Sequence, residues 1–320
     1  MAWLALLATL MLEQAVALPA NNPVYALAYW LSDATAGQFN AGRPRHGLYA
    51  WLALVGSAAL LSGALFFAAR SLHWIAAWAV DVGVLYFTFG FRQFSHPLTR
   101  IQGALEAGDV AAARQLLAEL KQRTDPAFRV SELTPGEIAR QAIEYGLVAA
   151  HRHVFGVLFW FLLMPGPVGA VMYRMSDFVS RRWNPRAAAG AMALPPDRFG
   201  EFAQRTFQWI DWIPARLTAL GFAIVGDFEG AVDCWRRAGA NARETVNSRS
   251  LILSAAGGAL GFRVLPEAES ARLMEAPGRE GADLGEPNPQ GMRSAVGLVW
   301  RALVLWMILL LLLTAAAILK

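Results

Sequence analysis

The chain has 320 residues, of which 56% are hydrophobic and 16% are charged, with a mean hydropathy of +0.37 and a formal net charge of +4. Soluble domains average roughly a quarter charged residues, so this composition argues against an ordinary soluble protein. The arginines flank apolar segments, which membrane topology explains more simply than a nucleic-acid partner. The one cysteine, Cys234, excludes an internal disulfide.

Four segments are predicted to span a bilayer, which takes a helix of about 20 apolar residues. They are residues 2–18, 48–69, 72–91 and 295–319. The first segment lacks a basic start and Glu13 interrupts it, so we expect it to be retained and not cleaved as a signal peptide. Asp81 lies within the third segment and must face a partner or water, or stay protonated.

Residues 92–153 predict soluble helices. Two arms rich in alanine and leucine flank Gly108 and Asp109, which indicates a helix–turn–helix with Asp109 as an N-cap. A further helix is expected to begin at Thr134, with Glu137 three residues later as in a capping box, and to end near residue 153.

Residues 154–173 are apolar but contain Pro165-Gly166-Pro167 at their middle. Prolines remove amide donors and break helices, and non-helical backbone at membrane depth must be covered by protein or water. We therefore expect a broken or re-entrant helical hairpin, with a kinked single span as the alternative. Residues 212–225 are too short to span alone and predict an interfacial or re-entrant helix.

The distribution of arginine predicts the topology. The stretches 92–153, 174–208 and 226–294 each carry six or more arginines. If residues 154–173 re-enter, all three stretches face the cytoplasm, as the positive-inside rule favours. We accordingly predict a multi-pass protein of a bacterial inner membrane with most of its loops cytoplasmic.

The predicted fold class is all-α: a polytopic helical membrane protein with a broken or re-entrant helix and cytoplasmic helical segments. Its expected parts are N-terminal transmembrane helices over 1–91, cytoplasmic helices with embedded segments over 92–263, a flexible linker over 264–294, and a C-terminal transmembrane helix over 295–320.

No phosphate-loop, dinucleotide or metalloprotease motif is present, and no metal site is predicted. His151 and His153 flank Arg152 and do not share a helix face, so they suit a joint metal site poorly. Glu144 lies two turns before His151 on the same face. Asp211 and Arg216 bracket Pro214 beside apolar sequence, where charges are usually paired or functional.

These residues predict a cytoplasm-facing cavity at the membrane surface. Its expected lining is Glu144, His151, His153, Tyr173, Arg174, Asp211 and Arg216. The arginines suit an anionic ligand, because guanidinium binds carboxylate or phosphate in bidentate fashion. The alternative is a structural knot of ion pairs in the same space. Individual catalytic residues are not assigned.

Three stretches carry a resemblance, together with the helical pair around Gly108-Asp109 and Ala112-Ala113-Arg114. The three stretches are FGEFAQRTFQWIDWIPARLTALGFAIVGDFEGAVDCWR (199–236), GPVGAVMYRM (166–175) and SAAGGALGFR (254–263). Together they resemble the CobD/CbiB family of cobalamin biosynthesis, the adenosylcobinamide-phosphate synthases. Asp211-Trp212 before Pro214 is also similar to the AmpE family, which is linked to regulation of β-lactamase induction.

The resemblance to the synthases implies an enzyme that joins an aminopropanol moiety to adenosylcobyric acid, with ATP and Mg²⁺ as the cofactors if that activity is retained. The residues that match the family pattern are Tyr173, Arg174, Pro214, Ala215, Arg216, Gly258 and Gly261. The family's early His-Pro-Val reads Asn22-Pro23-Val24, its Gly-Arg-Asp-Thr and Ala-Glu-Asn motifs lack clear counterparts, and Phe207 and Gln208 replace its paired aspartates.

Three functional hypotheses follow. The first is a divergent CobD/CbiB-like protein with a binding or regulatory role, because the scaffold is retained while acidic residues are lost. The second is an active synthase, and the third is an AmpE-like modulator of β-lactamase induction. The expected partners are the lipid bilayer and an anionic small molecule or corrinoid, with no nucleic acid.

Overall fold

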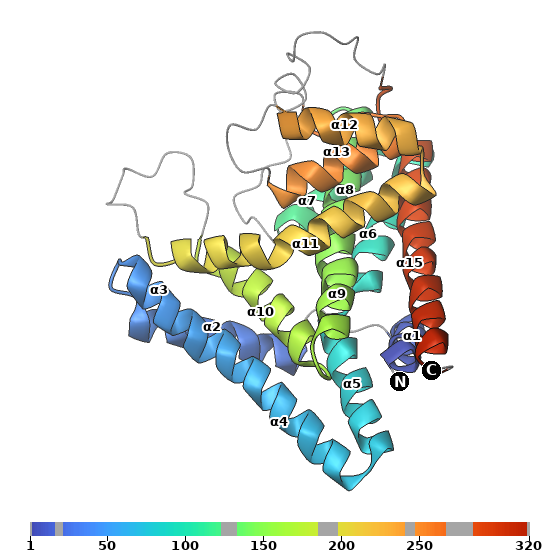
Figure 1. The fold of residues 1–320 in the computed structure, drawn as a ribbon. Coiled ribbons are helices and arrows are strands. Elements are labelled where there is room, and N and C mark those ends of the chain that lie inside the picture. The colour runs from blue at the N-terminus through green and yellow to red at the C-terminus, as the bar shows by residue number, and fades with distance from the viewer. Residues whose placement is uncertain are drawn as a thin grey trace. The chain divides into compact units, whose positions relative to one another are not determined.

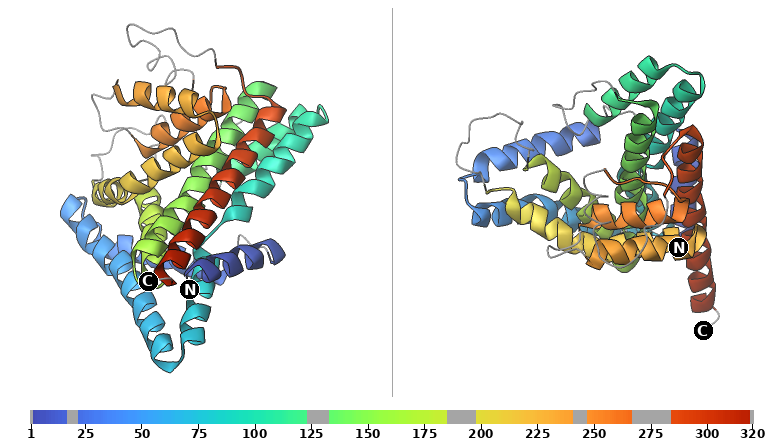
Figure 2. Two further views of the ribbon diagram at one scale, coloured as in Figure 1. Left: turned by 45° about the vertical axis from the view of Figure 1, so that its right-hand side comes forward. Right: turned by 90° about the horizontal axis from the view of Figure 1, so that it is seen from above.

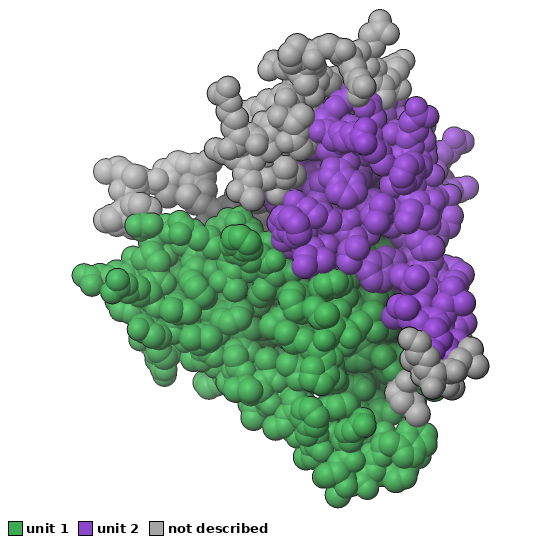
Figure 3. All heavy atoms as spheres, in the orientation of Figure 1, with its two compact units in different colours: residues 1–92, 152–211 green, residues 93–151, 212–320 purple. Residues whose placement is uncertain are grey.

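The computed structural model describes residues 2–16, 22–122, 133–184, 198–240, 247–266 and 284–318. Within these ranges the chain is helical, and the one β-type pairing is an isolated bridge between Phe262 and Gly285 (Figure 1). The predicted all-α class is therefore confirmed. The chain divides into two compact units, which are described separately (Figure 3).

The first unit comprises Met1–Arg92 and Arg152–Asp211. Its helices are α1 (Ala2–Ala15), α2 (Pro23–Phe39), α3 (Pro44–Trp51), the π-helical turn η1 (Leu52–Gly56), α4 (Ser57–Leu72), α5 (Trp74–Thr88), most of the π-helical turn η2 (His151–Phe155), α9 (Gly156–Leu163), α10 (Val168–Arg182) and the first part of α11 (Glu201–Val225). A buried cluster that includes Leu54, Val179 and Phe199 joins η1, α10 and the segment before α11.

The second unit comprises Gln93–His151 and Trp212–Lys320. It holds most of α6 (Phe91–Glu106), α7 (Val110–Gln122), α8 (Pro135–Ala150), the rest of α11, α12 (Phe228–Ala240), α13 (Ser248–Leu260) and α15 (Pro289–Ile318). Figures 1 and 2 show α12 and α13 side by side. Their close approach depends on glycine, because a Cβ atom at Gly258 would lie 2.2 Å from the carbonyl oxygen of Gly230.

Three helices are long and apolar enough to cross a membrane: Pro44–Leu72, Pro135–Leu163 and Pro289–Ala316. Two of them correspond to the segments expected at 48–69 and 295–319. The segments expected at 2–18 and 72–91 form helices of only 14 and 15 residues, α1 and α5. At 1.5 Å per residue these are shorter than the roughly 30 Å hydrocarbon core, so both helices are shorter than expected, and their crossing of a membrane stays a prediction.

The third long helix corrects the helix that the sequence predicted to end at residue 153. α8 continues through η2 into α9 without a break, because no proline lies between Ala150 and Leu163. The π-helical turn η2 changes the backbone hydrogen-bond pattern locally, and the helix continues through it. The predicted start is confirmed, since Thr134 and Glu137 form a reciprocal capping box.

The chain reverses at Pro165-Gly166-Pro167, as the broken-hairpin prediction required. Gly166 has φ +61°, which favours glycine, and α10 begins two residues later. α9 and α10 pack closely, since a Cβ atom at Gly169 would lie 1.9 Å from the carbonyl oxygen of Trp160. The backbone thus forms a hairpin here, while the choice between a re-entrant and a crossing segment stays a prediction.

The short helix expected from Trp212 is the second half of α11, a helix of 25 residues. Pro214 lies inside it and cannot donate to the carbonyl of Ile210. The indole Nε1 of Trp160 donates a hydrogen bond to that carbonyl at 3.2 Å. A side chain from α9 thus replaces the missing backbone donor, which is one means by which proline is tolerated here.

The predicted turn at Gly108-Asp109 is confirmed. Gly108 has φ +74°, and the Asp109 carboxylate accepts from the amide of Ala112. Residues 185–197 and 267–283, where loop and linker were predicted, lie outside the described residues. The final helix begins at Pro289, six residues before the expected start of the last span.

Candidate functional site

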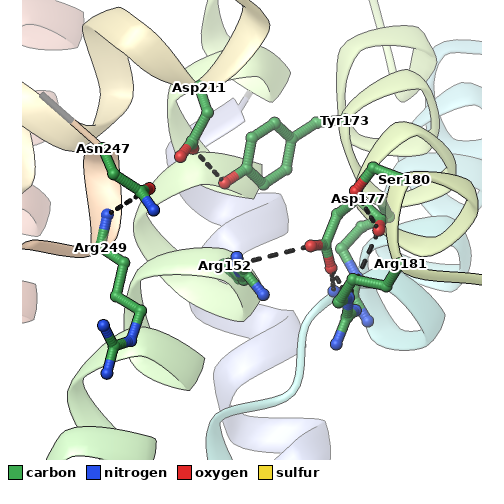
Figure 4. A network of polar contacts seen from close by, with 9 residues as sticks. Arg152, Tyr173, Asp177, Ser180, Arg181, Asp211, Asn247 and Arg249 are labelled. Atoms are coloured by element: carbon green, nitrogen blue, oxygen red, sulfur yellow. Dashed lines mark hydrogen bonds and ion pairs between the residues drawn. The ribbon is translucent and has the colours of Figure 1, made fainter. Parts of the chain in front are cut away.

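An arginine cluster surrounds Asp177 in the first unit. Arg174, Asp177 and Arg181 lie on one face of α10, because spacings of three and four residues align on a helix. Arg174 Nη1 lies 3.2 Å from Asp177 Oδ2, and Arg181 pairs with the same oxygen. Arg152 on η2 brings its Nε to 3.6 Å from Oδ1. We call Arg152, Arg174 and Arg181 the arginine cluster. Figure 4 shows Arg152 and Arg181 beside Asp177.

The Asp177 side chain is fully buried, whereas the three arginine side chains are 16–36% exposed. Burial alone would raise the pKa of the Asp177 carboxyl, but the positive charges of Arg181, Arg152 and Arg174 outweigh it and lower this pKa below its usual value. Asp177 is consequently an ionised anchor that orients the arginines, since a buried carboxylate needs such partners.

Tyr173 and Asp211 form a second buried polar contact in the first unit. The Tyr173 hydroxyl donates to Asp211 Oδ1 at 2.7 Å, and both residues are buried (Figure 4). Gly156 on α9 makes room for the ring, because a Cβ atom there would lie 2.2 Å from the tyrosine hydroxyl. The ring also packs against Phe207 with centroids 5.6 Å apart.

His153 lies near this group. It lies within electrostatic range of Asp177 and of the arginine cluster. Its Nδ1 is buried and has no hydrogen-bond partner among the described residues. The first unit thus brings together four of the predicted site residues, namely His153, Tyr173, Arg174 and Asp211.

The remaining three predicted residues belong to the second unit and have separate contacts. Glu144 pairs with Arg249 at 2.7 Å and with Arg140 at 3.5 Å. The Nδ1 atom of buried His151 lies 2.9 Å from the Thr218 hydroxyl.

Arg216 folds back on its own helix. It donates to the carbonyl of Trp212 at 3.0 Å and stacks 3.7 Å from the centroid of the Trp212 ring. This hydrogen bond and this cation–π contact are typical of an amphipathic side chain at a helix surface. The single cavity containing all seven residues therefore remains a prediction.

The sequence prediction missed Arg152, Asp177, Arg181 and Arg249. A signal for two of them was present, because Arg174, Asp177 and Arg181 repeat at helical spacing in YRMSDFVSR. Arg152 was visible only as the residue between two histidines. Its approach to Asp177 depends on how η2 packs on α10, which helical spacing does not specify.

The described residues do not fit a Mg²⁺ site built from several protein carboxylates. Among them, no group of three or more histidine, cysteine, aspartate or glutamate side chains gathers in a metal-binding arrangement. Asp177 is surrounded by arginine charges, which oppose a cation there.

Comparison with known proteins supports one family over nearly the whole chain. The family model described as CobD/Cbib protein matches residues 5–299. The chain belongs to the CobD/CbiB family. The family resemblance inferred from the three sequence stretches is thereby confirmed, and the AmpE-like likeness stays a prediction.

Two CobD relatives illustrate the similarity. The chain is 28% identical over 317 residues, 97% of each chain, to the cobalamin biosynthesis protein CobD of Stutzerimonas stutzeri (strain A1501). It is 31% identical over 172 residues, 51% of each chain, to the protein of the same name from Chromobacterium violaceum (strain ATCC 12472). No solved structure matches the chain.

Proposed function

We propose that this CobD/CbiB-family protein acts in cobalamin biosynthesis as a membrane-bound adenosylcobinamide-phosphate synthase. The observation that carries the proposal is the end-to-end similarity to a CobD protein, which covers 97% of both chains. A similarity that covers nearly the whole of both chains favours the shared activity over a newly acquired role.

The first-unit site is the proposed place of that activity. Tyr173 and Arg174 match the family pattern, and each makes a contact with a buried aspartate. Buried polar networks hold side chains in fixed orientations, as substrate binding requires. In this proposal Tyr173 positions Asp211, and the arginines bind an anionic or corrinoid substrate.

A divergent binding or regulatory role is the second candidate. It is favoured by Phe207 and Gln208, which stand where the family has paired aspartates. In this case the scaffold would bind its ligand without forming the amide.

Complementation distinguishes the two candidates. The chain is expressed in a bacterial strain that lacks its synthase and is supplied with cobyric acid. Restored cobalamin-dependent growth is expected from the synthase. No growth, with the membrane level of the protein equal to that of a functional CobD control, would favour the binding role.

The AmpE-like role is proposed from the segment 199–236, in which Asp211-Trp212 stands before Pro214 and Arg216-Leu217 follows. Deleting the gene and measuring β-lactamase induction in its own host tests it. An unchanged induction would count against this role and would leave the synthase proposal intact.

A further inference from the structure

Arg152 has hydrogen-bonding capacity that the described protein does not use. A guanidinium carries five N–H donors. Arg152 reaches Asp177 at 3.6 Å, beyond hydrogen-bonding distance, and its other contact is with the face of the Phe207 ring at 5.8 Å. Its side chain is 26% exposed, so the site is open to a ligand without being fully solvated.

Arg174 offers a second, similarly placed group. It donates one hydrogen bond, from Nη1 to Asp177 Oδ2, and its side chain is only 16% exposed. Because Arg152 and Arg174 both approach the same carboxylate, their guanidinium groups lie close together. Asp177 fixes their positions but carries one negative charge against the three positive charges of the arginine cluster.

His153 adds an independent polar group. Its Nδ1 is buried without a hydrogen-bond partner in the described part of the chain. Burying such an atom unsatisfied is costly, and the charges of Arg174, Arg181 and Arg152 act on this ring, so its free nitrogen needs a hydrogen-bond partner at this place. A ligand oxygen would supply it.

We propose that Arg152, Arg174 and His153, with Arg181 adding charge, form a binding site for a phosphate-type oxyanion. Two guanidinium groups at one place match the geometry and charge of a phosphoryl group. Arginines of limited exposure interact with it more strongly than fully solvated ones, since the local dielectric constant is lower. The phosphoryl group belongs to a soluble phosphate ester or to an anionic lipid headgroup.

This site does not depend on the proposed synthase activity, because a binding or regulatory protein could use it equally. Its test is accordingly a binding measurement on the full-length protein. The chain is reconstituted in nanodiscs of zwitterionic lipid, and inorganic phosphate is titrated at constant ionic strength. Broadening of the phosphorus-31 resonance reports binding.

Saturable broadening is expected for the unmodified protein. Arg152→Gln is expected to weaken phosphate binding at least about tenfold, the effect of losing one or two charge-assisted hydrogen bonds. Arg152→Lys keeps the charge but loses the planar guanidinium, so its phosphate affinity should lie between those of the unmodified protein and Arg152→Gln. The matched control is Arg198→Gln, because Arg198 is a 54% exposed arginine of the same unit that pairs with Glu201. It should bind phosphate like the unmodified protein.

A lipid arm separates the two sources of the phosphoryl group. The unmodified protein and Arg152→Gln are placed in nanodiscs containing phosphatidate, and retained lipid is quantified after exchange into zwitterionic lipid. Phosphatidate retention that requires Arg152, without binding of inorganic phosphate, assigns the site to a lipid headgroup. If the unmodified protein binds neither probe, or if Arg198→Gln weakens binding as much as Arg152→Gln, the proposal is overturned.

Discussion

The buried carboxylate of Asp177 requires positively charged side chains around it. A carboxylate without solvent exposure is tolerated only with charged partners, and Asp177 has three arginines within 3.6 Å or less. Ser180 also donates to the Asp177 carbonyl at 2.9 Å, which holds this part of α10 in place. The cost of the buried charge is offset by a rigid, positively charged group.

The depressed pKa of Asp177 predicts a pH dependence of stability. Its folded-state pKa lies below the unfolded value near 3.8, so its contribution is fully present above about pH 4 and is lost as pH falls through the folded-state pKa. Asp177→Asn should cost about 3–5 kcal/mol of unfolding free energy at pH 7. Chemical unfolding in detergent should show this difference constant from pH 7 to 5 and shrinking below pH 4. A difference that does not change with pH would mean that the Asp177 pKa is the same in the folded and unfolded protein, which contradicts the depressed pKa.

The contact between Tyr173 and Asp211 gives a second residue-scale prediction. Tyr173→Phe removes a buried donor from Asp211 and should lower the unfolding free energy by about 1–3 kcal/mol. Thermal unfolding in detergent measures the effect. Tyr49→Phe is the control, since Tyr49 is 56% exposed and should change stability little. If Tyr173→Phe and Tyr49→Phe change the stability equally, the hydrogen bond between Tyr173 and Asp211 does not stabilise the fold.

At the scale of elements, the hairpin of α9 and α10 is the feature that positions the first-unit site. It places Gly156 and Trp160 on one arm and Tyr173 and Arg174 on the other. The turn at Gly166 and the lack of a side chain at Gly169 allow the two arms to approach.

Gly169→Ala should therefore disrupt the hairpin. The added methyl group would meet backbone atoms of Trp160, which cannot rotate away, so a loss of about 3 kcal/mol is expected. Gly83→Ala provides a matched control on α5, because nothing lies within 4 Å of its added Cβ atom. Thermal unfolding of both variants checks the prediction. A Gly169→Ala protein as stable as Gly83→Ala would mean that the arms are not packed this closely.

The contact of Trp160 with α11 predicts a coupling to Pro214. Trp160→Phe should cost about 1–2 kcal/mol, because the Ile210 carbonyl loses its donor. In a Pro214→Ala background the restored backbone amide can donate to Ile210, so the same substitution should cost about 1 kcal/mol less. A double-mutant cycle of unfolding free energies measures the coupling. Strictly additive effects would contradict the replacement of the proline's missing donor by the indole.

At the scale of the whole molecule, the hairpin bears on topology. A reversal at residues 164–167 returns the chain toward the side from which α9 came, whether or not its tip reaches the far side of the membrane. The basic stretches 92–153 and 174–208 are then expected on one side, which is the cytoplasmic side by the positive-inside rule. The stretch 226–294 is expected there as well.

Site-directed labelling tests this topology. In a Cys234→Ser background, single cysteines at Arg123, Asn184 and Gly281 should all react with reagents from the cytoplasmic side. A membrane-impermeant maleimide applied to spheroplasts and to inverted vesicles distinguishes the sides. Labelling of the Asn184 position from the periplasmic side alone would show that residues 154–173 cross the membrane and do not re-enter.

The sequence by itself determined the features that depend on neighbours along the chain. The helical class, the capping box at Thr134, the turn at Gly108-Asp109 and the break at Gly166 all follow from local backbone chemistry. The family was also visible in the sequence, since its motifs lie within continuous stretches.

Only the tertiary structure decided which side chains meet. Local sequence did not show that α8 runs on to Leu163 or that α1 and α5 are too short to span by length. It also did not show that Arg152 approaches Asp177, because this contact joins η2 and α10 through helix packing. A buried charge is stabilised by partners close in space, and helical periodicity identifies only those on its own helix.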